Sequence, residues 1–274
     1  MSRKSAHKLS EPTQAQLADR HELYEASVQD VEVEVDFLTE TYQSIRGKRA
    51  RRFREDFCGT ASAACEWVRR APENQSVGID LDRPTLDWGI DHRVSRLSAE
   101  QQMRVRLIHD NVLHADAPKA DIIGAFNFSY FIFNTRAQLR EYFEAARAGL
   151  ADDGLLFLDA FGGSESYSEM REKTKLDGFT YVWHQAKYHP VTGFMRCHIH
   201  FHFNDGSKMK KAFTYEWRIW TLPELRELLL EAGFSQVDVY WEGTDEDGEG
   251  NGIYAPSATG EADPAWIAYL VARP

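Results

Sequence analysis

Two acidic side chains and one glycine turn are the strongest indication of chemistry in the sequence. Glu55 precedes the small-residue turn Cys58-Gly59-Thr60, which opens a helical run over residues 63–70. About 20 residues further on, a second apolar run ends at Asp80. In doubly wound sheets this order places backbone N–H groups and a helix N-terminus beside a ligand, and the second acid accepts hydrogen bonds from ribose hydroxyls. The spacing therefore predicts a nucleoside-binding turn with Asp80 as its ribose partner.

The elements around this turn alternate between strands and helices. Short apolar runs at residues 76–80, 105–108, 120–127 and 155–161 have the length of strands, and helical patterns separate most of them. Alternation of this kind predicts a parallel sheet that is covered on both faces. Ahead of the turn, apolar residues between His21 and Ile45 recur at three to five residues and predict one or two amphipathic helices.

The second half of the chain has a different character. Runs rich in Thr, Tyr, Val, Phe and Trp over residues 179–220 are separated by turn formers and predict three antiparallel strands. A helix that begins after the N-cap Thr221 follows, and residues 237–241 and 266–272 are the last expected strands. The Gly-, Asp- and Glu-rich stretch between them, residues 242–264, predicts a long loop.

Six segments in this order resemble the class I S-adenosylmethionine-dependent methyltransferases over residues ~50–274. Glu55-Asp56-Phe57-Cys58-Gly59-Thr60-Ala61 stands in the register of the family's first motif, acid-x-Gly-Cys-Gly-Thr-Gly, with Phe57 and Ala61 in place of two glycines. The resemblance implies an α/β fold with a doubly wound, mostly parallel seven-stranded sheet. It also implies an N-terminal helical cap at 1–48 and a Rossmann-like methyltransferase domain at 49–274, with an antiparallel β insertion at about 179–220 after the fifth strand.

The resemblance implies S-adenosyl-L-methionine as the cofactor and indicates which residues would bind it. The acid and the next backbone amide after the third strand would bind the adenine, and an N-terminal tyrosine would help to cover the cofactor. Residues at the end of the fourth strand lie where ligands of such sheets bind. The expected cofactor-binding residues are Tyr24, Glu55, Phe57, Gly59, Thr60, Asp80, Leu81, Asp110, Asn111, Val112, Asn127 and Ser129.

The glycine count argues against a dinucleotide. A reductase that binds NAD normally needs Gly-x-Gly-x-x-Gly, because the pyrophosphate must approach the backbone of the turn, and only Gly59 is present here. A sulfonium cofactor carries no phosphate and does not need that cradle. No catalytic residue is predicted, since in-line displacement at a sulfonium methyl depends mainly on positioning and on the exclusion of water.

The composition limits the kinds of partner that the protein is expected to bind. The 43 acidic and 32 basic residues give a formal net charge of −11, which disfavours nucleic acid as a partner. No apolar run approaches the ~18 residues that span a bilayer, so no membrane segment is expected. Three scattered cysteines are too few for a disulfide framework, which predicts a cytoplasmic protein. We expect a small-molecule methyl acceptor, and a homodimer is left open.

Two other functions are left open. A non-catalytic nucleoside-binding or scaffold protein of the same fold would account for Phe57 and Ala61 in the turn. A metal-dependent enzyme could use His198, His200 and His202, which share one face of an expected strand. This histidine pattern lacks a carboxylate at a fixed spacing and is therefore not specific, so no metal site is predicted.

Overall fold

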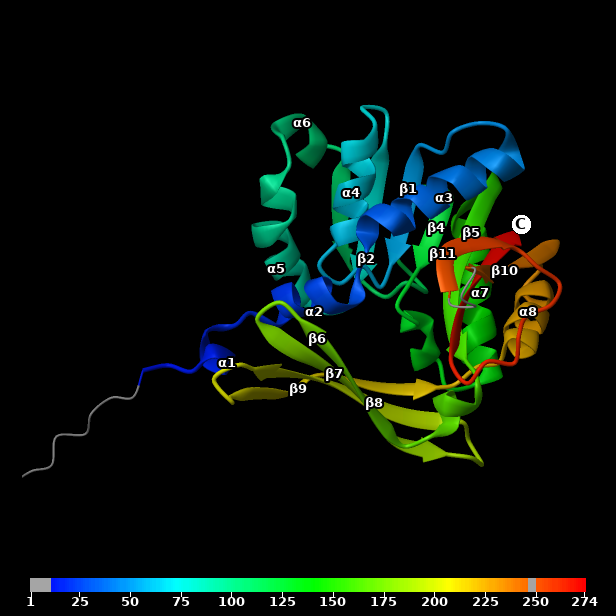
Figure 1. Ribbon diagram of the computed structural model, residues 1–274. Coiled ribbons are helices and arrows are strands. Elements are labelled where there is room, and N and C mark those ends of the chain that lie inside the picture. Colours follow the sequence, from blue (N-terminus) through cyan, green and yellow to red (C-terminus); the bar gives the residue numbers. More distant parts are fainter. Residues whose placement is uncertain (1–10, 246–249) are drawn as a thin grey trace, which may run out of the picture. The chain divides into compact units, whose positions relative to one another are not determined.

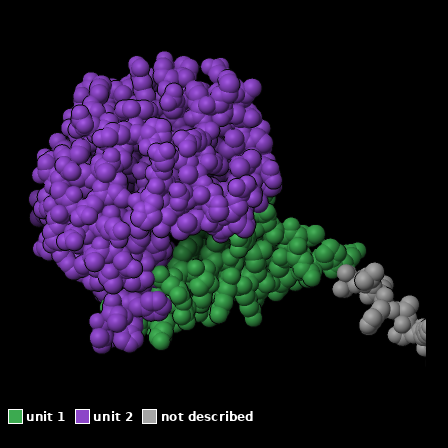
Figure 2. All heavy atoms as spheres, turned by 180° about the vertical axis from the view of Figure 1, so that it is seen from behind, with its two compact units in different colours: residues 1–29, 169–188, 195–216 green, residues 30–168, 189–194, 217–274 purple. Residues whose placement is uncertain are grey.

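The computed structural model describes residues 11–245 and 250–274. The contacts within the chain divide it into two compact units, which Figure 2 colours separately. Of the described residues, the smaller unit contains 11–29, 169–188 and 195–216. The larger unit contains residues 30–168, 189–194 and 217–274.

The larger unit is built on an eight-stranded sheet with the order β11-β10-β12-β5-β4-β1-β2-β3 (Figure 1). Strands β1 to β5 pair in parallel, and β12, β10 and β11 extend the sheet beyond β5 by antiparallel pairing. The carboxyl ends of the parallel strands therefore meet at one edge of the sheet. The bounds are β1 Arg52–Asp56, β2 Gln75–Asp80, β3 Val105–His109, β4 Ala120–Ala125, β5 Leu150–Gly162, β10 Gln236–Thr244, β11 Gly250–Pro256 and β12 Trp266–Arg273.

Helices of the larger unit bury their apolar faces against this sheet. In α3, Val35, Leu38 and Tyr42 are fully buried and belong to the same core cluster as Phe53 and Phe157 of the sheet. Helices α7 and α8 pack against each other, and α7 also contacts β4 and β5. The bounds are α3 Val31–Arg46, α4 Ser62–Arg70, α5 Arg83–His92, α6 Ala99–Gln102, α7 Arg136–Gly149 and α8 Leu222–Glu231, with short 3-10 helices at Val94–Arg96, Ser129–Ile132 and Ser164–Tyr167.

The smaller unit consists of two N-terminal helices and a four-stranded antiparallel sheet of order β6-β7-β8-β9. Within this unit the Tyr24 ring lies 4.9 Å from the Phe213 ring, and the Gln14 backbone N–H donates a hydrogen bond to Asp205 Oδ2 at 2.9 Å. Both contacts fasten the helices to the sheet. The bounds are α1 Gln14–Leu17, α2 Arg20–Val28, β6 Met170–Leu176, β7 Phe179–His189, β8 Phe194–Phe203 and β9 Lys208–Arg218.

The expected α/β class, the parallel core and the antiparallel insertion after β5 are confirmed, with two differences in detail. The main sheet has eight strands instead of seven, because β11 lies within the stretch 242–264 that was expected to be a loop. The insertion has four strands instead of three and begins at Met170, ahead of the expected residue 179, because β6 precedes β7. Both additional strands lie at the edge of their sheet.

The expected cap of residues 1–48 is divided between the two compact units at Gln29. Helix α3 belongs to the larger unit because its buried side chains pack into the core of that unit. The separation of roles between residues 1–48 and 49–274 stays a prediction. Within the described residues, no helix has both the length and the apolar composition that crossing a membrane requires.

Candidate active site

The turn between β1 and α4 has left-handed backbone at three alternate positions. The φ angles are 59° at Phe57, 52° at Gly59 and 59° at Ala61. The Cys58 N–H donates to Ile79 O at 3.0 Å, which fixes the turn to β2. The turn therefore has the backbone expected of the three-glycine motif, although two of the three residues carry a side chain. A left-handed conformation costs such residues roughly 1–2 kcal/mol each and persists only where the surroundings enforce it.

Packing accounts for both of these side chains. The Phe57 ring lies 5.5 Å from the Tyr142 ring of α7 and 6.2 Å from the Phe133 ring, measured between centroids. Ala61 is fully buried and packs with Cys58, Ala64 and Leu86. The side chains at the two substituted positions thus belong to the aromatic and small-residue packing around the turn.

The carboxylate of Asp80 lies directly beside Gly59. The Gly59 N–H donates to Asp80 Oδ2 at 2.8 Å, and the Asp82 N–H donates to Oδ1 at 2.8 Å. Burial raises the pKa of Asp80. A Cβ added at Gly59 would meet no atom closer than Thr85 Cγ2 at 3.9 Å, so there is space beside the turn. The carboxylate, which offers about four acceptor sites, retains capacity for a ligand hydroxyl.

The residues expected after β2 and β3 lie at the same edge of the sheet as Asp80. Leu81 and Asp110 are exposed, and Asn111 is half-buried. The Asn111 N–H donates to the neighbouring Asp110 Oδ1 at 2.7 Å. Val112, in contrast, is buried, and its carbonyl accepts a hydrogen bond from Arg54 Nη2 at 3.0 Å. Asp110 and Asn111 therefore present polar groups at this edge, whereas Val112 closes the core beneath them.

Three charged side chains at the end of β1 are buried. Arg54 and Asp56 form an ion pair with Nε and Oδ1 2.6 Å apart, and Tyr142 Oη donates to Asp56 Oδ2 at 3.1 Å. Glu55 accepts one hydrogen bond, from the Ala64 N–H at 2.9 Å. Burial, together with the negative charges of Asp80 and Asp56, raises the pKa of Glu55 to about 8. Arg54 and Asp56 thus satisfy each other, while Glu55 keeps acceptor capacity for a ligand.

The turn after β4 is held by Asp159 of β5. Its two carboxylate oxygens accept hydrogen bonds from the Asn127 N–H at 2.7 Å and the Phe128 N–H at 2.9 Å, and both donors have left-handed backbone. The Ser129 hydroxyl donates to Phe126 O at 2.7 Å. Burial raises the pKa of Asp159 to about 7. The expected residues Asn127 and Ser129 are half-buried here, and the Ser129 hydroxyl is used within its own turn.

Two carboxylates of this site, those of Glu34 and Asp159, are absent from the sequence-based prediction. Burial, together with the charges of Glu55, Asp159 and Asp30, raises the pKa of Glu34 to about 8. The half-buried Glu34 lies four positions before the fully buried Leu38, so it borders the buried stripe of α3. In the sequence, only this spacing points to Glu34, and only the position of Asp159 within the apolar run 155–161 points to that residue.

Tyr24 and Thr60 are held by contacts within their own units. Tyr24 lies on α2 in the smaller unit, packed against Phe213, and its role toward the cofactor stays a prediction. Thr60 is buried in the turn, and its Oγ1 lies 3.2 Å from Ser62 Oγ at the start of α4.

The histidine face of β8 is integrated into the smaller sheet. His198 Nδ1 lies 2.9 Å from Thr214 Oγ1, and His200 Nδ1 accepts a hydrogen bond from the Lys211 N–H at 3.0 Å. His200 Nε2 lies 3.3 Å from His184 Nδ1. Among the residues that the structure describes, no group of three or more His, Cys, Asp or Glu is arranged to hold a metal ion. The histidine nitrogens named here thus have partners other than a metal ion within the sheet, and the metal-dependent alternative stays untested.

Solved methyltransferases share this fold. An S-adenosylmethionine-dependent methyltransferase from Clostridium acetobutylicum superposes with a TM-score of 0.68 at 15% identity, covering 92% of this chain and 96% of that one. The amino pentose methyltransferase CalS10 from Micromonospora echinaspora gives 0.64 at 16% identity, covering 93% and 96%. The sugar N-methyltransferase KedS8 from Streptoalloteichus gives 0.61 at 14% identity, covering 100% and 99%.

Sequence comparison adds no closer relative. No protein-family model matches the chain. No curated protein sequence matches it significantly. At 14–16% identity the likeness concerns the fold. The chain therefore has the fold of the class I S-adenosylmethionine-dependent methyltransferases.

Proposed function

We propose that the protein is an S-adenosylmethionine-dependent methyltransferase whose acceptor is an amine on a small, sugar-like molecule. The observation that carries this proposal is a cluster of carboxyl groups with raised pKa values along the carboxyl edge of the parallel strands. Glu55, Asp80 and Asp159 contribute carboxylates there, and the pKa of Glu34 responds to two of them. Such a site favours cationic ligands, because unpaired buried carboxylates are costly until a positive charge balances them.

The site fits S-adenosylmethionine in charge and in donor chemistry. Asp80, held by the Gly59 and Asp82 backbone, would accept hydrogen bonds from the ribose hydroxyls. Asp110 and Asn111 would bind the adenine, and Glu55 would balance the ammonium group. When bound, the cofactor supplies a methyl group on a positively charged sulfur. Its two positive charges would favour the ionised forms of these carboxyl groups, whose pKa values burial raises.

The chain's own contribution to the reaction would be positioning, water exclusion and removal of one proton. A protonated amine must lose a proton before its lone pair is available. Glu34 suits this task, because its pKa of about 8 lies near the working pH. No hydrogen bond or ion pair occupies its carboxylate within the described residues, whereas both Asp159 oxygens accept backbone N–H groups. We therefore assign Glu34 as general base and Asp159 as a fixed negative charge beside it.

The names of the structural neighbours agree with an amine acceptor. CalS10 is an amino pentose methyltransferase, and KedS8 is a sugar N-methyltransferase. A small acceptor also agrees with the net charge of −11, which would repel a phosphate backbone. Cytoplasmic location and a homodimer stay predictions; the three cysteines are all free and buried.

Paired acceptors test this proposal. The protein is incubated with S-adenosylmethionine and with sugars that differ only in carrying an amino or a hydroxyl group at one position. We expect S-adenosylhomocysteine and a singly methylated product with the amino sugars and none with the hydroxyl partners. Turnover on hydroxyl partners alone would contradict the amine assignment. Binding of S-adenosylhomocysteine without turnover on any acceptor would favour the scaffold alternative.

A further inference from the structure

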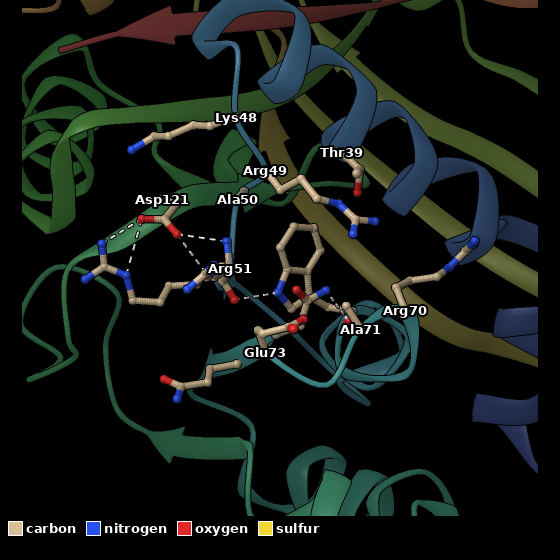
Figure 3. A pocket seen from close by; sticks show the side chains of 13 residues that line it. Thr39, Lys48, Arg49, Ala50, Arg51, Arg70, Ala71, Glu73 and Asp121 are labelled. Carbon is tan, nitrogen blue, oxygen red and sulfur yellow. Dashed lines mark hydrogen bonds and ion pairs between the residues drawn. The ribbon is translucent and has the colours of Figure 1, made fainter.

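A cavity lies at the edge of the large sheet where the parallel strands begin. Its volume is about 700 Å³. It is lined by Arg52, Gln75 and Asp121 at the starts of β1, β2 and β4, and by Arg70 and Ala71 at the end of α4 (Figure 3). The Cys58-Gly59-Thr60 turn lies at the other end of β1 and α4. The cavity is therefore separate from the carboxylate site, and its size suits a ligand as large as a nucleotide.

The charge of this cavity is opposite to that of the protein. Its lining has two carboxylates, those of Glu73 and Asp121. Against them stand five cationic side chains, those of Lys48, Arg49, Arg51, Arg52 and Arg70. In a chain of net charge −11, such a concentration of positive charge marks a local site for an anion.

Three of the five cations are already neutralised by the protein. Lys48 forms an ion pair with Asp153. Arg52 Nη2 lies 2.6 Å from Asp121 Oδ1. Arg70 forms two ion pairs. Its Nη1 lies 3.0 Å from Asp36 Oδ1, and its Nε lies 2.6 Å from Glu66 Oε1. These three side chains shape the wall, and their charge is largely balanced.

Arg49 and Arg51 are the cations left for a ligand. Both are exposed, and neither guanidinium has an ion pair or hydrogen bond to any residue that the structure describes. Figure 3 shows the Arg49 side chain extending toward Thr39 of α3. Asp121 does not balance them, because its carboxylate accepts hydrogen bonds from the Arg51 and Arg52 backbone and from the Arg52 side chain.

The backbone that carries Arg51 is held in place. Its N–H donates to Asp121 Oδ2 at 2.9 Å. Its carbonyl accepts hydrogen bonds from Trp67 Nε1 at 3.1 Å and from the Gln75 N–H at 2.8 Å. The Arg51 backbone is thus held by hydrogen bonds, while its guanidinium has no partner among the described residues. Because the backbone is already ordered, ligand binding would cost less conformational entropy.

We propose that this cavity binds a small phosphorylated molecule, with Arg49 and Arg51 holding its phosphate groups. Guanidinium groups match phosphate oxygens in a bidentate geometry, and two of them without counter-ions suit a ligand that carries more than one negative charge. The acidic character of the rest of the chain disfavours a long polyanion, so the ligand is expected to be small.

Isothermal titration calorimetry with inorganic tripolyphosphate and with ADP tests this site. We expect saturable one-to-one binding of both probes to the full chain, weakening as salt is added. The double variant Arg49→Ala/Arg51→Ala should bind each probe at least ~10-fold more weakly, since each lost charge-assisted contact is worth about that much. Its affinity for S-adenosylhomocysteine should equal that of the wild type, which also shows that the variant is folded.

Arg140→Ala provides the matched control. It removes an exposed arginine of α7 that pairs with Glu144 and lies outside the cavity lining. The control should bind both probes like the wild type. Lack of saturable binding by the wild type, undiminished binding by the double variant, or an equal loss in the control would overturn the proposal. Citrate binding as tightly as tripolyphosphate would overturn its assignment to phosphate.

Discussion

The Gly59 N–H and Asp80 Oδ2 meet at 2.8 Å, joining the turn after β1 to the end of β2. Because Asp82 N–H holds the other carboxylate oxygen, the Asp80 side chain is fixed at both oxygens by backbone groups. The backbone around it is fixed in turn by the Cys58 hydrogen bond to Ile79. The candidate ribose site is therefore preorganised, and its geometry depends on how closely the neighbouring elements pack.

Gly89 of α5 is where that packing is closest. A Cβ at this position would lie 2.5 Å from Thr60 O, and backbone atoms cannot yield as a flexible side chain can. Although alanine is favoured over glycine in helices by about 1 kcal/mol, Gly89→Ala should destabilise the protein by ~1–3 kcal/mol through overpacking. Urea unfolding measures this change. Ile90→Ala, at an exposed position of the same helix, should stay within about 0.5 kcal/mol, and equal effects of the two changes would contradict this account.

Glu55 should make stability fall as the pH rises. Its folded pKa of about 8 lies above the ordinary value of 4.5, so folding favours the protonated form. The stabilisation is complete below pH 4.5 and is lost as the pH rises through 8. Between pH 6 and 8, wild type should lose up to roughly 1.4 kcal/mol per pH unit relative to Glu55→Gln. Unfolding curves of both proteins at several pH values measure this difference, and parallel pH dependences would contradict it.

The sequence predicted most of the parallel core because β2, β4 and β5 carry apolar runs, whereas the charged strand β1 is indicated only by the turn that follows it. The two strands it missed are both edge strands. Strand β6 reads Met-Arg-Glu-Lys-Thr-Lys-Leu, with five consecutive exposed residues, and β11 contains two glycines and an asparagine. Edge strands commonly carry such charged or irregular sequences, which protect their unpaired side from other chains. Apolar periodicity therefore gives no signal for them.

The candidate site was predictable where its residues are adjacent to strand ends and unpredictable where they come from elsewhere. Asp80 is the last residue of β2, and Asp110 follows β3 directly. Glu34 reaches the site from a helix rich in acids, and only its spacing to Leu38 distinguishes it from the solvent-facing Glu32. The direction of the Phe57 ring was equally inaccessible, because it depends on Tyr142, a partner far away in the sequence.

Glu34→Gln should slow methyl transfer without disturbing the fold. Loss of a general base typically lowers kcat by ~10²–10⁴-fold. Wild-type kcat should rise with pH through about 8, the pKa of Glu34, and the variant should lose that rise while its KM changes little. Glu32→Gln, at an exposed position of the same helix, is the control and should retain both kcat and the pH profile. An unchanged pH profile in Glu34→Gln would exclude Glu34 as the base.

The smaller sheet should lose stability in acid. Burial, together with the neighbouring positive charges of His184, His198, Arg171 and His202, lowers the pKa of His200 to about 4. Above pH 6.5 the ring is neutral in both states, but below it the unfolded chain takes up the proton first. Stability should therefore fall between pH 6.5 and 4. Circular dichroism during acid titration measures the midpoint, and His200→Gln should reduce this loss; an equal loss in the variant would contradict the assignment.

Calorimetric titration with S-adenosylhomocysteine, comparing wild type with Asp80→Asn, tests the proposed cofactor site most directly. We predict saturable one-to-one binding by the wild type. Asp80→Asn should bind ~10–100-fold more weakly, as expected for the loss of a charge-assisted hydrogen bond worth about 1.5–3 kcal/mol. Asp87→Asn, a half-exposed partner of Arg83 on α5, should bind like the wild type. Equal affinities of wild type and a folded Asp80→Asn protein, or no binding by the wild type, would contradict the account.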